Sequence, residues 1–277
     1  MVDELDQGGW AHFAPSELQT KVVGQTIRFF PTVGSTNDLI KDEARAGAAE
    51  GLVFVADEQV AGRGRRGRSW TAPAGSSLLV SVLLRPTWLQ PHDGFLLTIL
   101  AAVAAAEALE TPGLHVDLKW PNDLQIAGRK LGGILVETEI SADRLVWAVL
   151  GCGINVNWHP SVMPELASTA TSLSAQLGHP VARRPLLHAL LTTLDTRYAA
   201  LRSGAQSALL AAWRDRLSTL GQLVRVETPQ GLLHGRAEDV TAAGGLVIRD
   251  QAGERHVVTA GDVTVRPDTL GGNALDK

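Results

Sequence analysis

Short runs of apolar residues with the length of β-strands occur throughout the first 85 positions. They predict three strands, at residues 26–30 (TIRFF), 51–58 (GLVFVADE) and 76–85 (SSLLVSVLLR). Between the first two runs, Ser35 and Asp38 have the spacing of a capping box, which predicts a helix over residues 35–47. Residues 16–24 predict a shorter helix.

A longer apolar run, FLLTILAAVAAAEAL, follows Pro91. It reaches Glu107 before it attains the roughly 20 apolar residues that a membrane span needs, so it predicts a buried helix and no membrane association. The next block is rich in strand patterns, at residues 115–120, 124–139 and 144–157. Within it, residues 127–130 (AGRK) predict a hairpin turn.

The pattern changes once more after Gly221. Residues 184–220 have helical periodicity and few helix breakers. Beyond them, short strand patterns predict a small β-barrel or sandwich, at residues 222–228, 232–240, 245–250 and 255–259. Strands and helices alternate without a steady βαβ rhythm, which favours an α+β fold with a largely antiparallel or mixed sheet. We therefore predict a main domain over residues 1–220 and a β-domain over residues 221–270.

Composition and charge narrow the class of protein. Of 277 residues 45% are hydrophobic, which is enough to build a core and disfavours disorder. The net charge of −4 disfavours a general nucleic-acid binder, so any basic patch is local. Cys152 is the single cysteine, which excludes an intramolecular disulfide and fits a reducing compartment. The N-terminal residues MVDELDQGGW lack the features of a signal peptide, and we expect a cytoplasmic location.

Four arginines and three glycines occur within GRGRRGRSW, residues 62–70, called here the arginine loop. Its glycines satisfy G-x-G-x-x-G, but a dinucleotide fingerprint must open a helix directly, and Pro73 and Gly75 prevent one. Two interpretations remain. The loop is either a solvated basic loop or an anion clamp, in which guanidinium groups grip phosphate or carboxylate and glycines let the loop fold over a ligand.

Two further motifs carry candidate chemistry. In KWPNDL, Lys119 and Trp120 frame a predicted turn at Asn122 and Asp123, which is either ordinary turn chemistry or a contact to a nucleotide or its magnesium. In GRKLGGILVE, Arg129 and Lys130 are expected at a hairpin tip. The glycines at 132 and 133 interrupt a strand, which indicates close approach of a ligand or of backbone.

The segment GCGINVN, residues 151–157, ends a predicted strand. Cys152 between two glycines is expected to be a small buried residue rather than a nucleophile, because no histidine is linked to it by a motif. The eight histidines are scattered without metal-ligand spacing, so we predict no protein metal site.

The motifs STN, EQ-x-x-GRGRRGR-x-W, KWPNDL, GRKLGGIL and G-x-GIN, in this order and spacing, closely resemble the biotin protein ligases. The resemblance runs from Ser35 to Asn157 and continues more faintly into the C-terminal segment. It implies an α+β catalytic domain related to class II aminoacyl-tRNA synthetases, followed by an SH3-like β-barrel. It also implies two reactions: biotin and MgATP form biotinyl-5′-AMP, and biotin then passes to a lysine of the biotin carboxyl carrier domain of a carboxylase.

The resemblance also assigns residues. Arg65 and Lys130 are the expected catalytic residues. The expected biotin-binding residues are Ser35, Thr36, Asn37, Gln59, Gly62, Arg63, Gly64, Arg65, Trp70, Lys130 and Gly133. The expected ATP-binding residues are Arg63, Arg65, Arg66, Arg68, Trp70, Lys119, Asn122, Asp123 and Asn155. Magnesium is expected to bridge phosphates and to need few protein ligands.

Three other functions stay open. A lipoate or octanoate ligase of the same superfamily is disfavoured by the full arginine loop and KWPNDL. A nucleic-acid-binding protein needs aromatic platforms, and the chain has one tyrosine and five phenylalanines. A biotin sensor without ligase activity is disfavoured by the intact Lys130. About 25 residues precede the first predicted strand, too few for a helix-turn-helix, so we expect no operator binding. A homodimer is left open, because the family often dimerises through these loops.

Overall fold

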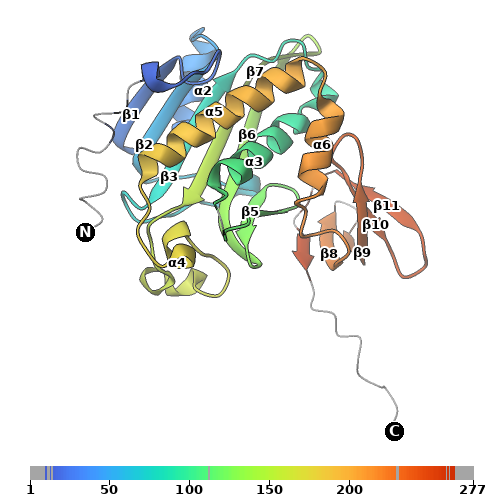
Figure 1. Cartoon of the computed structure of the whole chain (residues 1–277). Coiled ribbons are helices and arrows are strands. Elements are labelled where there is room, and N and C mark those ends of the chain that lie inside the picture. The colour runs from blue at the N-terminus through green and yellow to red at the C-terminus, as the bar shows by residue number, and fades with distance from the viewer. Residues whose placement is uncertain are drawn as a thin grey trace.

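A mixed seven-stranded sheet is the centre of the molecule (Figure 1). The computed structural model describes residues 10, 13, 15–111, 113–228, 231–259, 261 and 263–265. The strand order is β1-β2-β3-β7-β6-β5-β4, with β1 and β2 parallel and the other neighbours antiparallel, so the prediction of a mixed sheet is confirmed. The strands are β1 (Thr26–Val33), β2 (Leu52–Gln59), β3 (Ser77–Leu84), β4 (Asp117–Lys119), β5 (Asp123–Ile126), β6 (Arg129–Ser141) and β7 (Arg144–Asn155).

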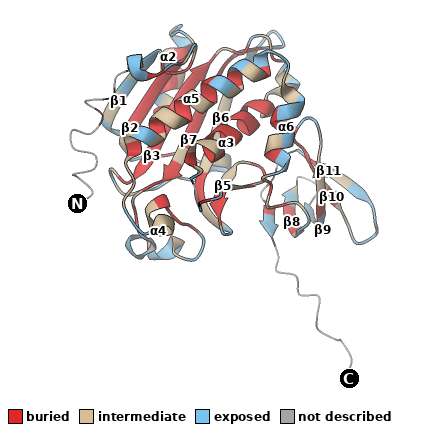
Figure 2. Cartoon of the chain, in the orientation of Figure 1, coloured by how far each residue is buried: buried red, intermediate tan, exposed pale blue. Residues whose placement is uncertain are grey.

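Both faces of this sheet are covered, because apolar side chains alternate between them along the central strands. On β2, Val53 and Val55 join the core beneath α3 (Phe95–Leu109) and α5 (Arg183–Arg202), whereas Leu52 and Phe54 pack with α2 (Thr36–Arg45) on the other face. Figure 2 shows the buried strands between these layers. The apolar residues at consecutive positions in the first half of β2 and along most of β3 therefore reflect burial on both faces of the sheet.

The alanine-rich run is the core helix α3, as predicted. Within the described residues, Pro91–Leu109 is the one helical stretch with the length and apolar composition of a membrane span, and 67% of an 18-residue window of it is buried inside the protein. It packs against α5 and α6 (Gln206–Arg214) and against the sheet. In the part of the chain that the structure describes, the remaining short helices are α4 (Leu173–Leu177) and five 3-10 turns, η1 (Pro15–Glu17), η2 (Arg65–Gly67), η3 (Pro91–Asp93), η4 (Pro160–Val162) and η5 (Pro164–Leu166).

The predicted helix over residues 16–24 is wrong, since only the 3-10 turn η1 forms there. The backbone N–H groups of Lys21, Val22 and Val23 instead donate to the buried carboxylate of Asp195 on α5, at 2.8 to 2.9 Å. The backbone conformation of this segment is therefore determined by a contact with a residue more than 170 positions away. The local sequence pattern cannot predict such a contact.

Replacing Asp195 with alanine should lower the free energy of unfolding by about 3 kcal/mol, because three backbone donors lose their acceptor. Urea unfolding of the variant measures the loss. Asp215→Ala is the matched control, since Asp215 is exposed at the end of α6. The explanation is wrong if both variants unfold at the same urea concentration.

The helix predicted after Ser35 forms as α2, but the capping box does not. Ser35 occupies the N-cap position without a side-chain capping hydrogen bond. The free N–H of Thr36 donates to Gln59 Oε1 at 2.7 Å, and the carboxylate of Asp38 pairs with Lys41 and Arg63. Side chains from β2 and the arginine loop thus replace the local cap.

The C-terminal strands form a separate five-stranded antiparallel sheet, in the order β11-β10-β9-β8-β12. The four predicted short strands are confirmed, and β12 is a fifth that the sequence pattern did not predict. They are β8 (Leu223–Thr228), β9 (Gly231–Val240), β10 (Leu246–Arg249), β11 (Arg255–Val258) and β12 (Val263–Val265). The turn between β9 and β10 packs on the main domain. Gly244 O accepts a hydrogen bond from the buried Trp120 indole at 2.9 Å, and a Cβ at Gly244 would lie 2.2 Å from Phe95.

Candidate active site

A cavity of about 150 Å³ opens where α2, the arginine loop and the strands β4 to β7 meet. Fourteen of the residues expected in the site line it: Ser35, Thr36, Asn37, Gln59, Arg63, Gly64, Arg65, Arg68, Trp70, Lys119, Asn122, Asp123, Lys130 and Gly133. Three expected residues do not, namely Gly62, Arg66 and Asn155. Asn155 is buried and donates to Thr171 O at 3.0 Å, so its amide supports the chain beside the site.

One side of the cavity is a polar wall, made by Ser35, Thr36, Asn37 and Gln59. The Oε1 atom of Gln59 accepts from the backbone N–H of Thr36 at 2.7 Å and from its hydroxyl at 2.9 Å. These two contacts fix the orientation of the Gln59 amide. The wall therefore presents a defined pattern of hydrogen-bond donors and acceptors.

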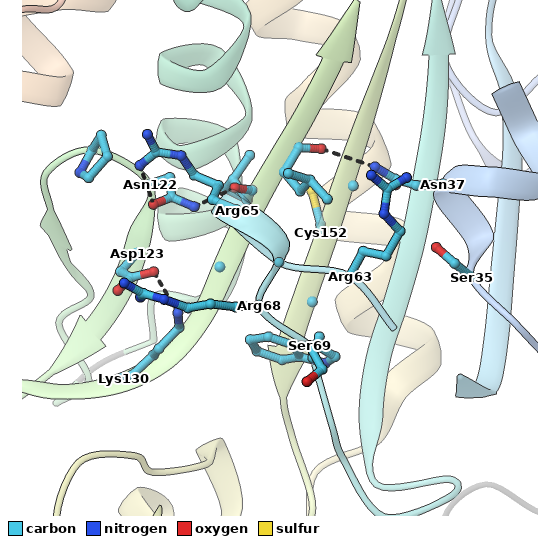
Figure 3. A pocket seen from close by; sticks show the side chains of 18 of the residues that line it. Ser35, Asn37, Arg63, Arg65, Arg68, Ser69, Asn122, Asp123, Lys130 and Cys152 are labelled. Atoms are coloured by element: carbon cyan, nitrogen blue, oxygen red, sulfur yellow. Dashed lines mark hydrogen bonds and ion pairs between the residues drawn. The ribbon is translucent and has the colours of Figure 1, made fainter. Parts of the chain in front are cut away.

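The arginine loop closes on itself above the cavity (Figure 3). Gly64 N donates to Arg68 O and Trp70 N donates to Gly62 O, at 2.7 and 2.9 Å. Its helical content is the single 3-10 turn η2, so the rejection of a dinucleotide fingerprint is confirmed. Arg65 reaches across the cavity to Asn122 Oδ1 at 3.3 Å.

Arg63 is held by two carboxylates on the polar-wall side. Its guanidinium lies 2.5 Å from Asp38 and 3.1 Å from Glu137, and Lys41 contacts the same two carboxylates at 2.8 Å. Burial opposes ionisation of Asp38 and Glu137. The hydrogen bonds and charges of the surrounding cations and of Asn37 outweigh burial, and the pKa of each carboxyl lies below its ordinary value.

Asp38→Asn should lower stability at neutral pH and have little effect in acid. Because the folded-state pKa of Asp38 lies below its ordinary value of 3.8, the ionised carboxylate stabilises the fold above about pH 4, and this contribution is lost as the pH falls through the lowered pKa. Urea unfolding of wild type and variant from pH 7 to pH 2 measures the difference. A gap between the two that does not shrink below about pH 4 would contradict this assignment.

Lys130 lies on the opposite side of the loop from the polar wall, as Figure 3 shows. Its ammonium nitrogen is 2.7 Å from Asp123 Oδ1 and 5.8 Å from the ring centre of Trp70. The turn residues of the predicted hairpin are Ala127 and Gly128, both with positive φ, so Arg129 and Lys130 begin β6 and do not form its tip. Lys130 therefore lies on a strand and not in the turn, and its side chain lines the cavity.

The turn of KWPNDL is one residue earlier than expected. It comprises Trp120, Pro121 and Asn122, and Asp123 begins β5. Asn122 Nδ2 donates to Ile134 O at 2.6 Å, which leaves its Oδ1 facing Arg65. The turn thus presents an oriented amide to the cavity, and the first residue of β5 presents a carboxylate.

Two glycines allow close packing around the site. A Cβ at Gly132 would lie 2.7 Å from Gly153 O, so this position serves approach of backbone rather than of a ligand. A Cβ at Gly153 would lie 2.8 Å from the Trp70 indole, which therefore lies directly on β7. The indole N–H of Trp70 is buried and has no hydrogen-bond partner within the part of the chain that the structure describes.

Sequence reasoning did not assign ten lining residues to the site: Ser69, Val80, Trp120, Pro121, Ile134, Leu135, Gly151, Cys152, Gly153 and Val263. Most are neighbours of the motif residues or their strand partners. The exception is Val263 on β12, for which the sequence contains no signal. Cys152 is buried, and burial raises the pKa of its thiol to about 12, which agrees with the expectation that it is not a nucleophile.

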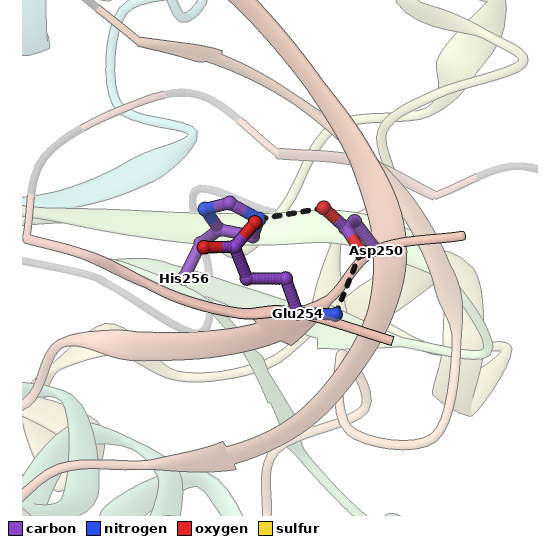
Figure 4. A group of neighbouring side chains, drawn as sticks. All are labelled: Asp250, Glu254 and His256. Atoms are coloured by element: carbon purple, nitrogen blue, oxygen red, sulfur yellow. Dashed lines mark hydrogen bonds and ion pairs between the residues drawn. The ribbon is translucent and has the colours of Figure 1, made fainter. Parts of the chain in front are cut away.

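A group of potential metal ligands, Asp250, Glu254 and His256, lies at the β10–β11 hairpin (Figure 4). The sequence gave no indication of it, because the residue spacing matches no common motif. Asp250 accepts from the backbone N–H of Glu254 at 2.9 Å and contacts His256 Nε2 at 2.7 Å. These contacts stabilise the hairpin itself.

Comparison with known proteins gives two family matches. Residues 29–155 match the biotin/lipoate A/B protein ligase family, and residues 219–266 match the biotin protein ligase C-terminal domain. The first range contains nearly all of the cavity, and the second contains the five-stranded sheet.

Individual relatives agree with these matches. The chain is 38% identical over 256 residues to the biotin–acetyl-CoA-carboxylase ligase of Mycobacterium tuberculosis, covering 88% of each chain. It is 34% identical to the bifunctional ligase/repressor BirA of Bacillus subtilis, covering 88% of this chain and 75% of that one. Among solved structures, the biotin protein ligase of Aquifex aeolicus in complex with biotin and ATP has a TM-score of 0.73 and 26% identity, with 87% and 99% of the two chains covered.

Proposed function

The chain belongs to the biotin protein ligase family, and from this premise we propose that it is an ATP-dependent biotin protein ligase. It joins biotin and ATP to give biotinyl-5′-AMP and pyrophosphate. It then transfers biotin to a lysine of an acceptor protein. Relatives named biotin–acetyl-CoA-carboxylase ligases support a biotin carboxyl carrier domain as that acceptor.

One observation carries this proposal: the cavity joins a hydrogen-bonding wall to a group of cations across an apolar stretch. Biotin has a neutral ureido ring at one end, an apolar arm, and a carboxylate at the other end. Thr36 and Gln59 suit the ring, Cys152 and Ile134 suit the arm, and Lys130 suits the carboxylate. The dithiolane ring of lipoate would leave the polar wall without hydrogen-bond partners.

The first step needs cations because a carboxylate must approach the α-phosphate of ATP, and negative charge then meets negative charge. A carboxylate oxygen forms a bond to the α-phosphorus, and pyrophosphate leaves. Lys130 holds the biotin carboxylate, and Arg65 stabilises charge that develops on the phosphate. Both side chains are prearranged, Lys130 by Asp123 and Arg65 by Asn122.

We propose supporting roles for the other expected residues. Arg63, Arg66 and Arg68 with the loop backbone cover the phosphates, while Lys119 and Asn122 face the ATP side. Magnesium bound to the phosphates would neutralise their charge. Asp123 is the carboxylate in the cavity, and carboxylate oxygen is the donor that magnesium prefers, so the site fits the ion.

In the second step the acceptor lysine attacks the acyl carbon of the adenylate and releases AMP. The arginine loop shields the mixed anhydride from water until then.

We further propose that residues 1–220 form a class II synthetase-like catalytic domain and residues 221–270 an SH3-like barrel. The absence of a second cysteine supports a cytoplasmic location.

ATP–pyrophosphate exchange tests the proposal. Purified protein, magnesium, ATP and labelled pyrophosphate are combined with biotin or with lipoate. Exchange that depends on biotin and not on lipoate is the expected result. Exchange with lipoate alone would assign the chain to lipoate ligation, and no exchange with either acid would overturn the enzyme assignment.

A further inference from the structure

The side chain of Asn37 lies across three strands of the main sheet. Ser81 on β3, Gly151 on β7 and Leu135 on β6 are aligned in register. The Oδ1 atom of Asn37 accepts from the Ser81 hydroxyl at 2.6 Å, and its Nδ2 donates to Leu135 O at 3.3 Å. A Cβ at Gly151 would lie 2.3 Å from Asn37 Oδ1, so the glycine makes room for this side chain.

The strongest partner of the Asn37 amide nitrogen is Glu137 Oε2 on β6, at 2.9 Å. Asn37 is only 4% exposed, and both ends of its amide are therefore used by protein groups. A carboxylate can only accept, so Glu137 determines which end of the amide carries the NH2 group. The Asn37 oxygen must then face Ser81.

Hydroxyl groups continue this chain of contacts towards the cavity. Ser81 Oγ lies 2.7 Å from Thr36 Oγ1, and the Thr36 hydroxyl donates to Gln59 Oε1 at 2.9 Å. Each hydroxyl has a single hydrogen, so with Ser81 donating to Asn37 and Thr36 donating to Gln59 the approach of the two hydroxyls is a contact without a hydrogen bond. Glu137 therefore orients the wall through Asn37, which is itself one of the wall residues.

Glu137 also contacts the arginine loop. Its Oε1 atom lies 2.8 Å from Lys41 and 3.1 Å from Arg63. One carboxylate therefore holds the polar wall through Asn37 and the loop through Arg63. A residue that contacts both can couple ligand binding at the polar wall to the position of the arginine loop.

We propose that Glu137 and Asn37 are positioning residues, which fix the ureido-binding wall and couple it to Arg63 of the arginine loop. This inference rests on the proposed function. It gives Asn37 a different role from the direct biotin contact that its motif indicates. Glu137 does not line the cavity and acts through Asn37 and Arg63. Asn37 acts by keeping its place in the wall, because its amide is used by Glu137, Leu135 and Ser81.

Steady-state exchange kinetics of Glu137→Ala and Glu137→Gln test the inference. Glu137→Ala should raise the KM for biotin about tenfold with a smaller change in kcat, because the Asn37 amide loses the nearer of its two acceptors. Glu137→Gln should return the KM to within about threefold of wild type, since its amide oxygen accepts from Asn37 and Lys41 keeps Asp38 as partner. Glu139→Gln is the matched control, two residues further along β6 and exposed, and should leave the KM unchanged.

Ser81→Ala is the second variant, for use if Glu137→Ala does not fold. It removes the donor to Asn37 Oδ1 and should raise the KM for biotin several-fold. An unchanged KM in a folded Glu137→Ala or Ser81→Ala protein would overturn the inference, as would a Gln variant no better than the Ala variant. Wild-type protein without biotin-dependent exchange would instead defeat the proposed function, so the two failures are distinguishable.

Discussion

Replacing Lys130 with methionine should slow biotin-dependent adenylation by about two to three orders of magnitude. The methionine keeps most of the side-chain volume, but the ammonium 2.7 Å from Asp123 is lost from the cavity. The biotin carboxylate would then approach the α-phosphate without its cation, beside an uncompensated Asp123. Single-turnover formation of biotinyl-5′-AMP measures the rate directly.

The neighbouring Arg129 provides the control for this result. It precedes Lys130 on β6, and successive side chains on a strand point to opposite faces. Arg129 does not line the cavity, so Arg129→Met should adenylate biotin at the wild-type rate. Lys130 has no role in the chemistry if its methionine variant reacts within about threefold of wild type.

Arg65→Gly should release the adenylate about a hundredfold faster than wild type, because the arginine loop loses its contact across the cavity to Asn122. The chemical step should suffer less than release. The variant is loaded with labelled biotin and ATP, excess unlabelled biotin is added, and the bound label is followed with time. Free adenylate would also biotinylate lysines on an unrelated protein in the same tube.

Two further variants separate the causes of release. Arg65→Ala removes the guanidinium without the added backbone freedom of glycine, and the same fast release is expected. Arg65→Lys keeps the charge but not the planar fork, and an intermediate rate is expected. Wild-type retention of the adenylate by Arg65→Ala would mean that loop flexibility, and not the arginine contact, sets the release rate.

Much of the fold follows from local patterns in the sequence. The strands at residues 51–58 and 76–85 carry apolar residues at consecutive positions, interrupted on β3 by Ser81, because both faces of the sheet are covered. The helix predicted at residues 16–24 fails because Asp195, distant in sequence, determines that backbone. Local helix propensity cannot predict a contact between residues so far apart in the sequence.

The candidate site likewise contains residues that the sequence predicts and residues that it does not. Motif residues such as Gln59, Asn122 and Lys130 were found because their neighbours in sequence carry the same signal. Glu137 was not found, although its carboxylate touches Asn37, Lys41 and Arg63. These contacts arise from strand register and helix position, which a linear pattern does not encode.

The hydrogen bond from the Trp120 indole to Gly244 has a consequence for how such proteins can be recombined. Trp120 belongs to the turn that carries Asn122, and its buried N–H depends on a carbonyl from the C-terminal sheet. The Gly244 turn, in addition, fits Phe95 only because it lacks a Cβ. In a chimera, the C-terminal sheet should therefore be exchanged together with Trp120 and Phe95, the residues of the main domain that contact the Gly244 turn.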